Sequence, residues 1–131
     1  MNKYLFFSLL IIIIVFLFFY FNKINSHFKY KLNNKNYSLL VADSNSEWTR
    51  GLMNYKDISE LKGVEGMIFI FPDRDFRSFW NENTYFDLDV YWLDGDKIVG
   101  KSYLPSIEKS KEVVIVDSKA KVNKVVELIR K

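Results

Sequence analysis

The feature that most constrains this chain is an uncharged apolar run near its start, LFFSLLIIIIVFLFFYF, from Leu5 to Phe21. As a helix rising about 1.5 Å per residue, such a run extends roughly 25 Å, close to the ~30 Å hydrocarbon core of a bilayer. The run predicts a transmembrane helix, which we expect to form an N-terminal signal-anchor over residues 1–25. The remaining residues, 26–131, are then the part that folds as a domain.

A cleaved signal peptide is the competing interpretation of this run. Signal peptides usually have a shorter apolar region that ends in a small-residue cleavage site, whereas FNKINSH follows here without one. The orientation stays open. The positive-inside rule would leave the following domain in the cytoplasm, while an ordinary signal-anchor would export it. The lysines concerned are Lys3 before the run and Lys23, Lys29, Lys31 and Lys35 after it.

Composition excludes several classes of function. The chain has 131 residues, which allows one domain, and it has no cysteine, which excludes disulfides and thiolate chemistry. The net charge is +3 and the lysines are spread out, so we expect no nucleic-acid partner. The one histidine, His27, lies close to the apolar run, which argues against a Ser-His-Asp triad.

The rest of the chain reads as short strands separated by turns. FKYKL and YSLLVA alternate around NNKN and predict a hairpin, and GMIFIF is apolar on both faces, as in a buried central strand. The segments FRSFW, LDVYWL, KIVGKSYL and EVVIVD complete about seven strands. A short helix is expected over residues 45–50. Helical spacing predicts a C-terminal helix from Val122, Val125, Val126 and Ile129. The expected fold is mainly β, a small sandwich or barrel with these two helices.

Four motifs then occur in a familiar order: RGLM at 50–53, EGMIFIF from Glu65, SFWNENT at 78–84 and LDVYWLDGD at 88–96. With them, residues 37–130 resemble the domain-of-unknown-function family 192. The resemblance implies a jelly-roll-like β-sandwich, often behind an export signal, which favours an extracytoplasmic domain, and it implies no activity. The chain departs from the family at Asn81 and Glu82, where Met-Lys is usual. Glu82 puts an acid in place of a base, which argues against anion binding by that loop.

Six residues form the candidate site, and they fit either a ligand pocket or a structural latch. Arg50 paired with Glu65 or Asp89 would fix the short helix against the sheet, because a charge near a core requires a partner. Asn83 and Thr84 can bond to the backbone and tie their loop, and Trp80 ends a strand beside them. The candidate residues are therefore Arg50, Glu65, Trp80, Asn83, Thr84 and Asp89.

We assign no catalytic residue, no metal ligand and no cofactor. The D-x-D pairs at 73–75, 87–89 and 94–96 are explained as turn and edge residues. The expected function is a membrane-anchored, non-catalytic binding or structural module of the cell envelope, with the membrane as partner through residues 5–21. A glycan or an envelope protein is a further expected partner. The alternative is a carboxylate-dependent enzyme or a carbohydrate-binding module, since rings beside Asp and Asn are typical of sugar recognition.

Overall fold

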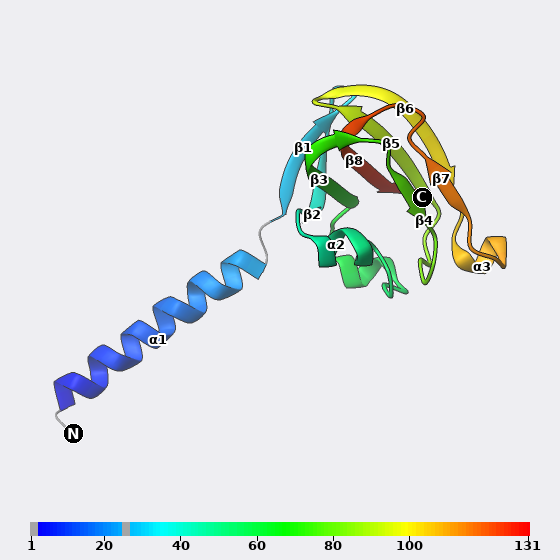
Figure 1. Cartoon of the computed structure of the whole chain (residues 1–131). Coiled ribbons are helices and arrows are strands. Elements are labelled where there is room, and N and C mark those ends of the chain that lie inside the picture. Colours follow the sequence, from blue (N-terminus) through cyan, green and yellow to red (C-terminus); the bar gives the residue numbers. More distant parts are fainter. Residues whose placement is uncertain (1–2, 25–26) are drawn as a thin grey trace.

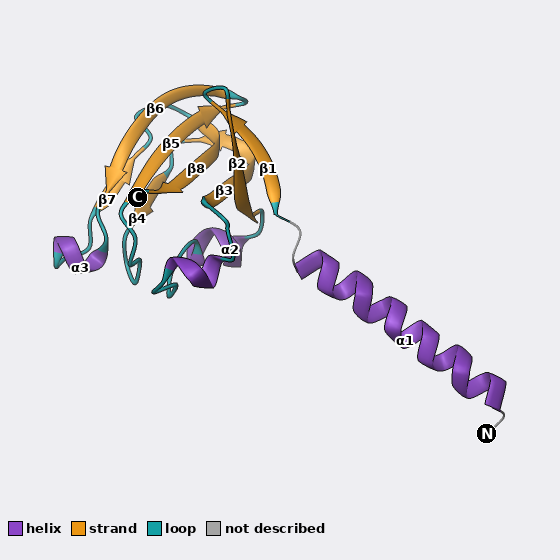
Figure 2. Ribbon diagram, turned by 180° about the vertical axis from the view of Figure 1, so that it is seen from behind, coloured by secondary structure: helices purple, strands orange, loops and turns teal. Residues whose placement is uncertain are grey.

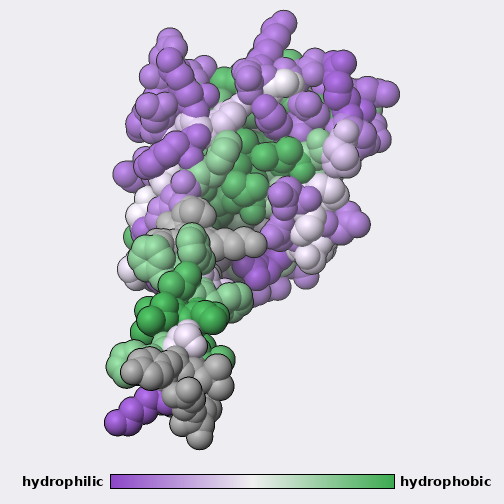
Figure 3. Space-filling model, turned by 90° about the vertical axis from the view of Figure 1, so that its left-hand side faces the viewer, coloured by the Kyte–Doolittle hydropathy of each residue, from purple (hydrophilic) through white to green (hydrophobic). Residues whose placement is uncertain are grey.

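A computed structural model describes residues 3–24 and 27–131 of the chain (Figure 1). Helix α1, Lys3–Ile24, projects away from a β domain that begins at strand β1. The side chains described between residues 7 and 20 are exposed and mostly apolar. Figure 3 shows them together with a second apolar patch on the β domain, bordered by polar residues. The boundary expected after residue 25 lies outside the described residues, because residues 25 and 26 are not among them.

The expected membrane anchor is not supported. Within residues 3–24 and 27–131, no helix is long and apolar enough to cross a membrane. This finding overturns both the predicted transmembrane helix and the single-pass membrane localisation that was inferred from it.

The β domain is built on one six-stranded sheet with the strand order β1-β2-β3-β8-β5-β6. All neighbouring pairs are antiparallel except β2 and β3, which run parallel. Its strands are Phe28–Leu32 (β1), Lys35–Ala42 (β2), Gly66–Asp75 (β3), Leu88–Asp94 (β5), Lys97–Leu104 (β6) and Val122–Ile129 (β8). A second sheet pairs β4, Ser78–Trp80, with β7, Ile115–Asp117. The protein is mainly β, as the alternating patterns predict, with one large curved sheet and one small one.

Short helices lie at the connections. Helix α2, Asn45–Arg50, and the 3-10 helix η1, Ile58–Leu61, belong to the crossover between the parallel strands β2 and β3. Helix α3, Ile107–Ser110, follows β6. Figure 2 shows α2 and α3 together beneath the arch of the large sheet.

The C-terminal helix expected from the sequence is wrong, because residues 122–129 form strand β8 at the centre of the sheet. A strand with neighbours on both sides and cover on both faces is apolar on both faces, so its valines can fall at helical spacing by coincidence. Val122, Val125 and Val126 are fully buried there. Branched side chains fit a pleated sheet better than a helix.

Two apolar clusters occupy the two faces of the large sheet. The larger cluster contains Phe69 and Trp92, and residues of α2, β4 and β7 pack against it. The smaller cluster contains Leu39 and Ile68 and is flanked by side chains from the two end hairpins. These hairpins meet where the Tyr30 hydroxyl donates to an Asp96 carboxylate oxygen over 3.0 Å.

The glycines of two sequence motifs have packing roles. In RGLM, Gly51 ends α2 with φ at +49°, a conformation that L side chains rarely adopt, and a Cβ there would lie 3.3 Å from the Phe69 ring. In EGM, a Cβ on Gly66 would lie 1.9 Å from the carbonyl oxygen of Glu127 on β8. Each motif therefore contains a glycine at a position where another part of the chain packs closely against the backbone.

Candidate functional site

An open cleft of about 640 Å³ lies on the side of the sheet that carries the larger cluster. Helix α2, the end of β3 and the small β4–β7 sheet supply its walls. Five of its lining residues are aromatic, and the set is Asn45, Trp48, Thr49, Phe71, Phe76, Arg77, Ser78, Phe79, Trp80 and Ile115. Such a volume lies within the ~300–1,000 Å³ range of small-molecule sites.

A bulge in β3 brings part of this wall into place. The ladder between β3 and β8 is regular up to Ile70 and resumes only at Asp75, so the residues between them, Pro72 included, leave the regular pairing. Pro72 cannot donate a ladder hydrogen bond, which suits it to a bulge. The bulge sets Phe71 at the cleft, and Phe76 and Arg77 follow on the way to β4.

The inner walls of the cleft are rigidly held. The Trp48 indole N–H donates to the carbonyl oxygens of Ala42 (3.0 Å) and Ile70 (3.1 Å), which ties α2 to two strands. The Trp48 ring lies 5.0 Å from that of Phe71. Phe79 meets Phe69 and Trp92 edge to face, with centroids 4.7 and 5.6 Å apart. These contacts preform the apolar wall.

The rim of the cleft exposes apolar surface to solvent. Phe76 and Ile115 are each 61% exposed, and Trp80 is 43% exposed. Contiguous exposed apolar surface around a hollow marks a binding site more often than isolated exposed residues do. The rim therefore offers exposed apolar surface, two aromatic rings included, to a ligand.

Arg77 is the one charged side chain among the described residues that line the cleft. Its guanidinium carbon lies 4.0 Å from the centroid of the Phe71 ring. Its Nη2 donates to the Asp73 carboxylate over 2.7 Å and to the Asp73 carbonyl oxygen over 3.1 Å. Within the described chain, its Nε is buried and has no hydrogen-bond partner. A buried donor left unpaired costs about 1–3 kcal/mol.

A smaller cavity of about 20 Å³ adjoins the cleft, and Glu127 on β8 is one of its lining residues. It shares Trp48, Thr49, Phe79 and Trp80 with the cleft. Glu127 is only 4% exposed, and burial raises the pKa of its carboxyl to about 8. No residue of the described structure forms an ion pair or a side-chain hydrogen bond with it.

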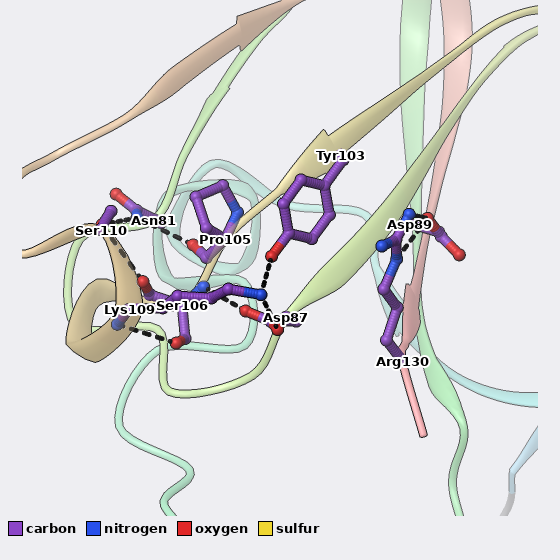
Figure 4. A network of polar contacts seen from close by, with 9 residues as sticks. All are labelled: Asn81, Asp87, Asp89, Tyr103, Pro105, Ser106, Lys109, Ser110 and Arg130. Carbon is purple, nitrogen blue, oxygen red and sulfur yellow. Dashed lines mark hydrogen bonds and ion pairs between the residues drawn. The ribbon is translucent and has the colours of Figure 1, made fainter.

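A polar network follows Trp80 along the chain and fixes the loop of residues 81–87 (Figure 4). Asn81 is fully buried. Its amide nitrogen donates to the Pro105 carbonyl oxygen (2.8 Å) and the Ser110 hydroxyl (2.9 Å), and its amide oxygen accepts from the backbone N–H of Val114 (2.7 Å). All polar atoms of this side chain are thus paired, and the loop is joined to α3 and to the chain before β7.

Asp87 lies at the other end of the loop. It accepts from the backbone N–H of Ser106 over 2.8 Å and from the ammonium of Lys109 over 3.2 Å. The hydrogen bond from Ser106, and then the contact with Lys109, lower the pKa of the Asp87 carboxyl. Tyr103 accepts from the same ammonium group over 2.9 Å. These partners make Asp87 part of the scaffold that holds Trp80 at the rim.

Five of the six predicted site residues fall into two groups, and the sixth belongs to neither. Arg50, Trp80 and Thr84 meet at the small cavity beside Glu127. Glu65 and Asp89 line a different cavity of about 330 Å³ near the end of β8. Asn83 is exposed, with φ at +49°, and lines neither.

The ion pairs differ from the expected latch. Asp89 accepts from Arg130 over 2.8 Å and lies 3.4 Å from the ammonium of Lys101. Glu65 accepts from the backbone N–H of Ser38 over 3.2 Å. Arg50 is exposed, and in the described part of the chain no ion pair joins it to Glu65 or Asp89. Thr84 is buried and its hydroxyl donates to the Glu82 carbonyl oxygen over 3.1 Å, so it does tie the loop.

Sequence reasoning missed Glu127, Arg77 and Phe76. The signal for Glu127 was present in VVELI, since an acid inside a run that is apolar on both faces must be buried if the run is a central strand. No metal centre accompanies these residues: within residues 3–24 and 27–131, no group of three or more His, Asp or Glu side chains could hold an ion.

Comparison with known proteins identifies the β domain. The model of domain-of-unknown-function family 192, described as "Uncharacterized ACR", matches residues 28–131. The chain belongs to this family. The match confirms the resemblance drawn from the four motifs, and it covers every strand of the β domain.

Two solved structures share the fold of this family 192 domain. One, from Sinorhizobium meliloti 1021, is described provisionally as a transcription regulator; it is 24% identical, with a TM-score of 0.62 and 77% of each chain covered. The other is a protein of unknown function from Novosphingobium aromaticivorans DSM 12444. It is 20% identical, with a TM-score of 0.59 and coverage of 77% of this chain and 70% of that one. At these identities the likeness concerns the fold alone. A comparison with curated proteins gave no significant match.

Proposed function

We propose that this family 192 domain is a binding module whose aromatic cleft accepts a small ligand with a flat apolar body and an anionic group. The observation that carries the proposal is the composition of the cleft wall, which combines five aromatic rings with a single guanidinium group. Burial of an aromatic group against such a wall is favourable by about 25 cal/mol per Å², and ring pairs add about 0.5–1.5 kcal/mol. The guanidinium, which also pairs with the Asp73 carboxylate, supplies positive charge and N–H donors for an anion.

The rigidity of the wall supports binding over a purely structural role. Trp48 is held by hydrogen bonds and Phe79 by ring contacts within the protein itself, so little side-chain freedom is lost when a ligand binds. Phe76 and Ile115, in contrast, remain exposed and contribute little to the core. Their exposure is explained if a ligand covers them.

Carbohydrate binding is the second candidate, favoured by one observation. Trp80 and Phe76 present exposed ring faces near the amide of Asn45 and the hydroxyls of Thr49 and Ser78, a combination suited to stacking and hydrogen bonding of a sugar. An enzyme acting through paired carboxylates is less well supported, because none of the described lining residues of the cleft is an Asp or a Glu.

The test is a titration of the full chain, followed by NMR, with three probes: 3-phenylpropionate, 3-phenyl-1-propanol and cellobiose. We expect 3-phenylpropionate to bind tightest and to shift resonances of Phe76 and Ile115. Phe76→Ala should weaken it about 5-fold or more, while Phe28→Ala, a matched exposed Phe outside the cleft, should not. Arg77→Gln should remove the preference for the carboxylate over the alcohol, and Arg74→Gln, outside the cleft, should preserve it.

Two results would contradict the proposal. One is the absence of cleft shifts with all three probes. The other is binding that Phe76→Ala and Arg77→Gln leave unchanged. If only cellobiose shifts the cleft resonances, the proposed ligand is wrong and the cleft binds carbohydrate.

A further inference from the structure

Glu127 is the least expected polar group of the domain. It lies on the central strand β8, and its partners in the two adjoining ladders are Met67 and Val90. All three residues are buried and lie on the same face of the sheet. An apolar side chain would stabilise this position, since a carboxyl without a partner is costly to bury. The structure of the sheet therefore does not explain why an acid is there.

The surroundings of Glu127 keep its carboxyl neutral. Arg50 is the one other charged residue among the described residues that line its cavity, and Arg50 is exposed. From β3, β4 and the loop after β4, the cavity is lined by Phe69, Phe79, Trp80 and Thr84, which carry no charge. A neutral carboxyl can donate a hydrogen bond, which a carboxylate cannot do.

The position of the cavity connects this donor with the cleft. The cavity has about 20 Å³ of free space, enough for one group the size of a water molecule. Four of its lining residues, Trp48, Thr49, Phe79 and Trp80, also line the cleft, so the two spaces are neighbours that share a wall. A small polar group at the inner end of a ligand is of the right size for it.

We propose that Glu127 forms an inner subsite of the cleft, where its protonated carboxyl donates a hydrogen bond to a neutral acceptor, such as the carbonyl oxygen of a ketone, ester or amide, on the bound ligand. This inference rests on the binding function proposed above and extends it. The ligand then carries an apolar body, an anionic group toward Arg77 and a carbonyl group toward Glu127. Benzenoid compounds with a carbonyl substituent are the simplest probes of this chemistry.

The experiment compares acetophenone with ethylbenzene, which has a similar shape but no acceptor. The full chain is labelled with carbon-13 at its glutamate carboxyl carbons, and Glu127→Gln identifies the Glu127 resonance by its loss. At pH 6 we expect acetophenone to shift that resonance and to bind at least about 5-fold tighter than ethylbenzene. At pH 9, where the carboxyl has lost its proton, the preference should disappear.

Two substitutions test whether hydrogen-bond donation at residue 127, rather than the titration of its carboxyl, is what matters. Glu127→Gln retains an N–H donor and should keep the preference for acetophenone at both pH values, whereas Glu127→Leu should abolish it at both. Glu112→Gln, on an exposed carboxyl outside both cavities, should behave as the wild type. The Gln variant keeps the test decisive if the Leu variant fails to fold.

The outcomes distinguish this inference from the proposed function. If both probes shift Phe76 and Ile115 with equal affinity and leave Glu127 unchanged, the inner subsite is wrong while the cleft remains a binding site. If neither probe shifts the cleft, the proposed function fails and the inner subsite fails with it. If the preference persists at pH 9 in the wild type, the acceptor is bound by another group and Glu127 is not the donor.

Discussion

The aromatic cleft and the polar network of Figure 4 adjoin each other in the chain at Trp80 and Asn81, yet they differ in how their polar atoms are satisfied. In the network, the amide of Asn81 makes three hydrogen bonds and Asp87 accepts from a backbone N–H and an ammonium group. Around the cleft, Arg77 Nε is unpaired among the described residues, and the Glu127 carboxyl has no side-chain partner there.

Between these two regions, the pairing of buried polar atoms separates scaffold from site more clearly than residue type does. Fully paired buried groups specify one conformation of a loop and need nothing further. Unpaired buried groups next to exposed rings lower the stability of the empty protein, and a ligand can recover part of that free energy. The loop that sequence reasoning favoured as a site is on this criterion mainly the support for one rim residue, Trp80.

The largest expected effect on stability comes from breaking the polar network at Asn81. Asn81→Ala removes three hydrogen bonds and leaves the N–H of Val114 and the carbonyl oxygen of Pro105 without their partner, so we expect the free energy of unfolding to fall by about 3–4 kcal/mol. Chemical denaturation measures it. Asn36→Ala, on an exposed position of β2, is the control and should change stability by less than about 0.5 kcal/mol. A loss below about 1 kcal/mol for Asn81→Ala would show that the network does not hold the loop.

The next effect concerns Glu127 and depends on pH. Its folded-state pKa of about 8 lies above its ordinary value of 4.5, so the folded protein keeps a proton that the unfolded chain releases. The stability that Glu127 contributes through this proton is fully present below about pH 4.5 and is lost as the pH rises toward 8. At pH 7 the free energy of unfolding is lower by about 3 kcal/mol. Glu127→Gln should therefore stabilise the protein at pH 7 but not at pH 4.5, and denaturation at both values measures this.

Glu112→Gln serves as the control for this comparison, because Glu112 is exposed. Equal stabilisation by Glu127→Gln at pH 4.5 and at pH 7 would mean that the pKa of Glu127 is the same in the folded and unfolded states. The contrast between an unpaired cleft and a paired network would then be weaker than the geometry indicates.

The smallest effects concern the expected latch. Asp89 has two cationic partners, Arg130 and Lys101, at the surface, and Asp89→Asn should lower the free energy of unfolding by less than about 1 kcal/mol. Arg50→Ala should change it by less than about 0.5 kcal/mol, because Arg50 is exposed. Thermal unfolding of both variants measures the difference. A loss of several kcal/mol for Arg50→Ala would restore the buried ion pair that the sequence predicted.

Local patterns of the sequence were sufficient for the hairpins and the first short helix. The expected hairpin of FKYKL and YSLLVA is β1 and β2, with Asn33 and Asn34 at positive φ in its turn, and helix 45–50 is α2. These elements depend on turn residues and alternation within a few positions. The central strand GMIFIF was also predicted, because its apolar run is too short and too uniform for a surface element.

Features that depend on distant neighbours were missed. Whether Val122–Ile129 is a helix or a strand is decided by β3 and β5 on either side of it, which its own spacing does not reveal. The same error removed Glu127 from the candidate residues, since on a C-terminal helix it would lie at the surface. The partner of Asp89 was missed for the same reason, because Arg130 follows directly after β8.

Strand β8 also has a consequence for synthesis and folding. It pairs with β3 and β5 in the middle of the sheet, although it is the last strand in chain order. A nascent chain that has emerged only as far as β7 has two half-sheets with unpaired edges that expose Gly66–Ile70 and Leu88–Leu93. The sheet is thus completed only when β8 is available, and until then the two unpaired edges are open to pairing with other chains.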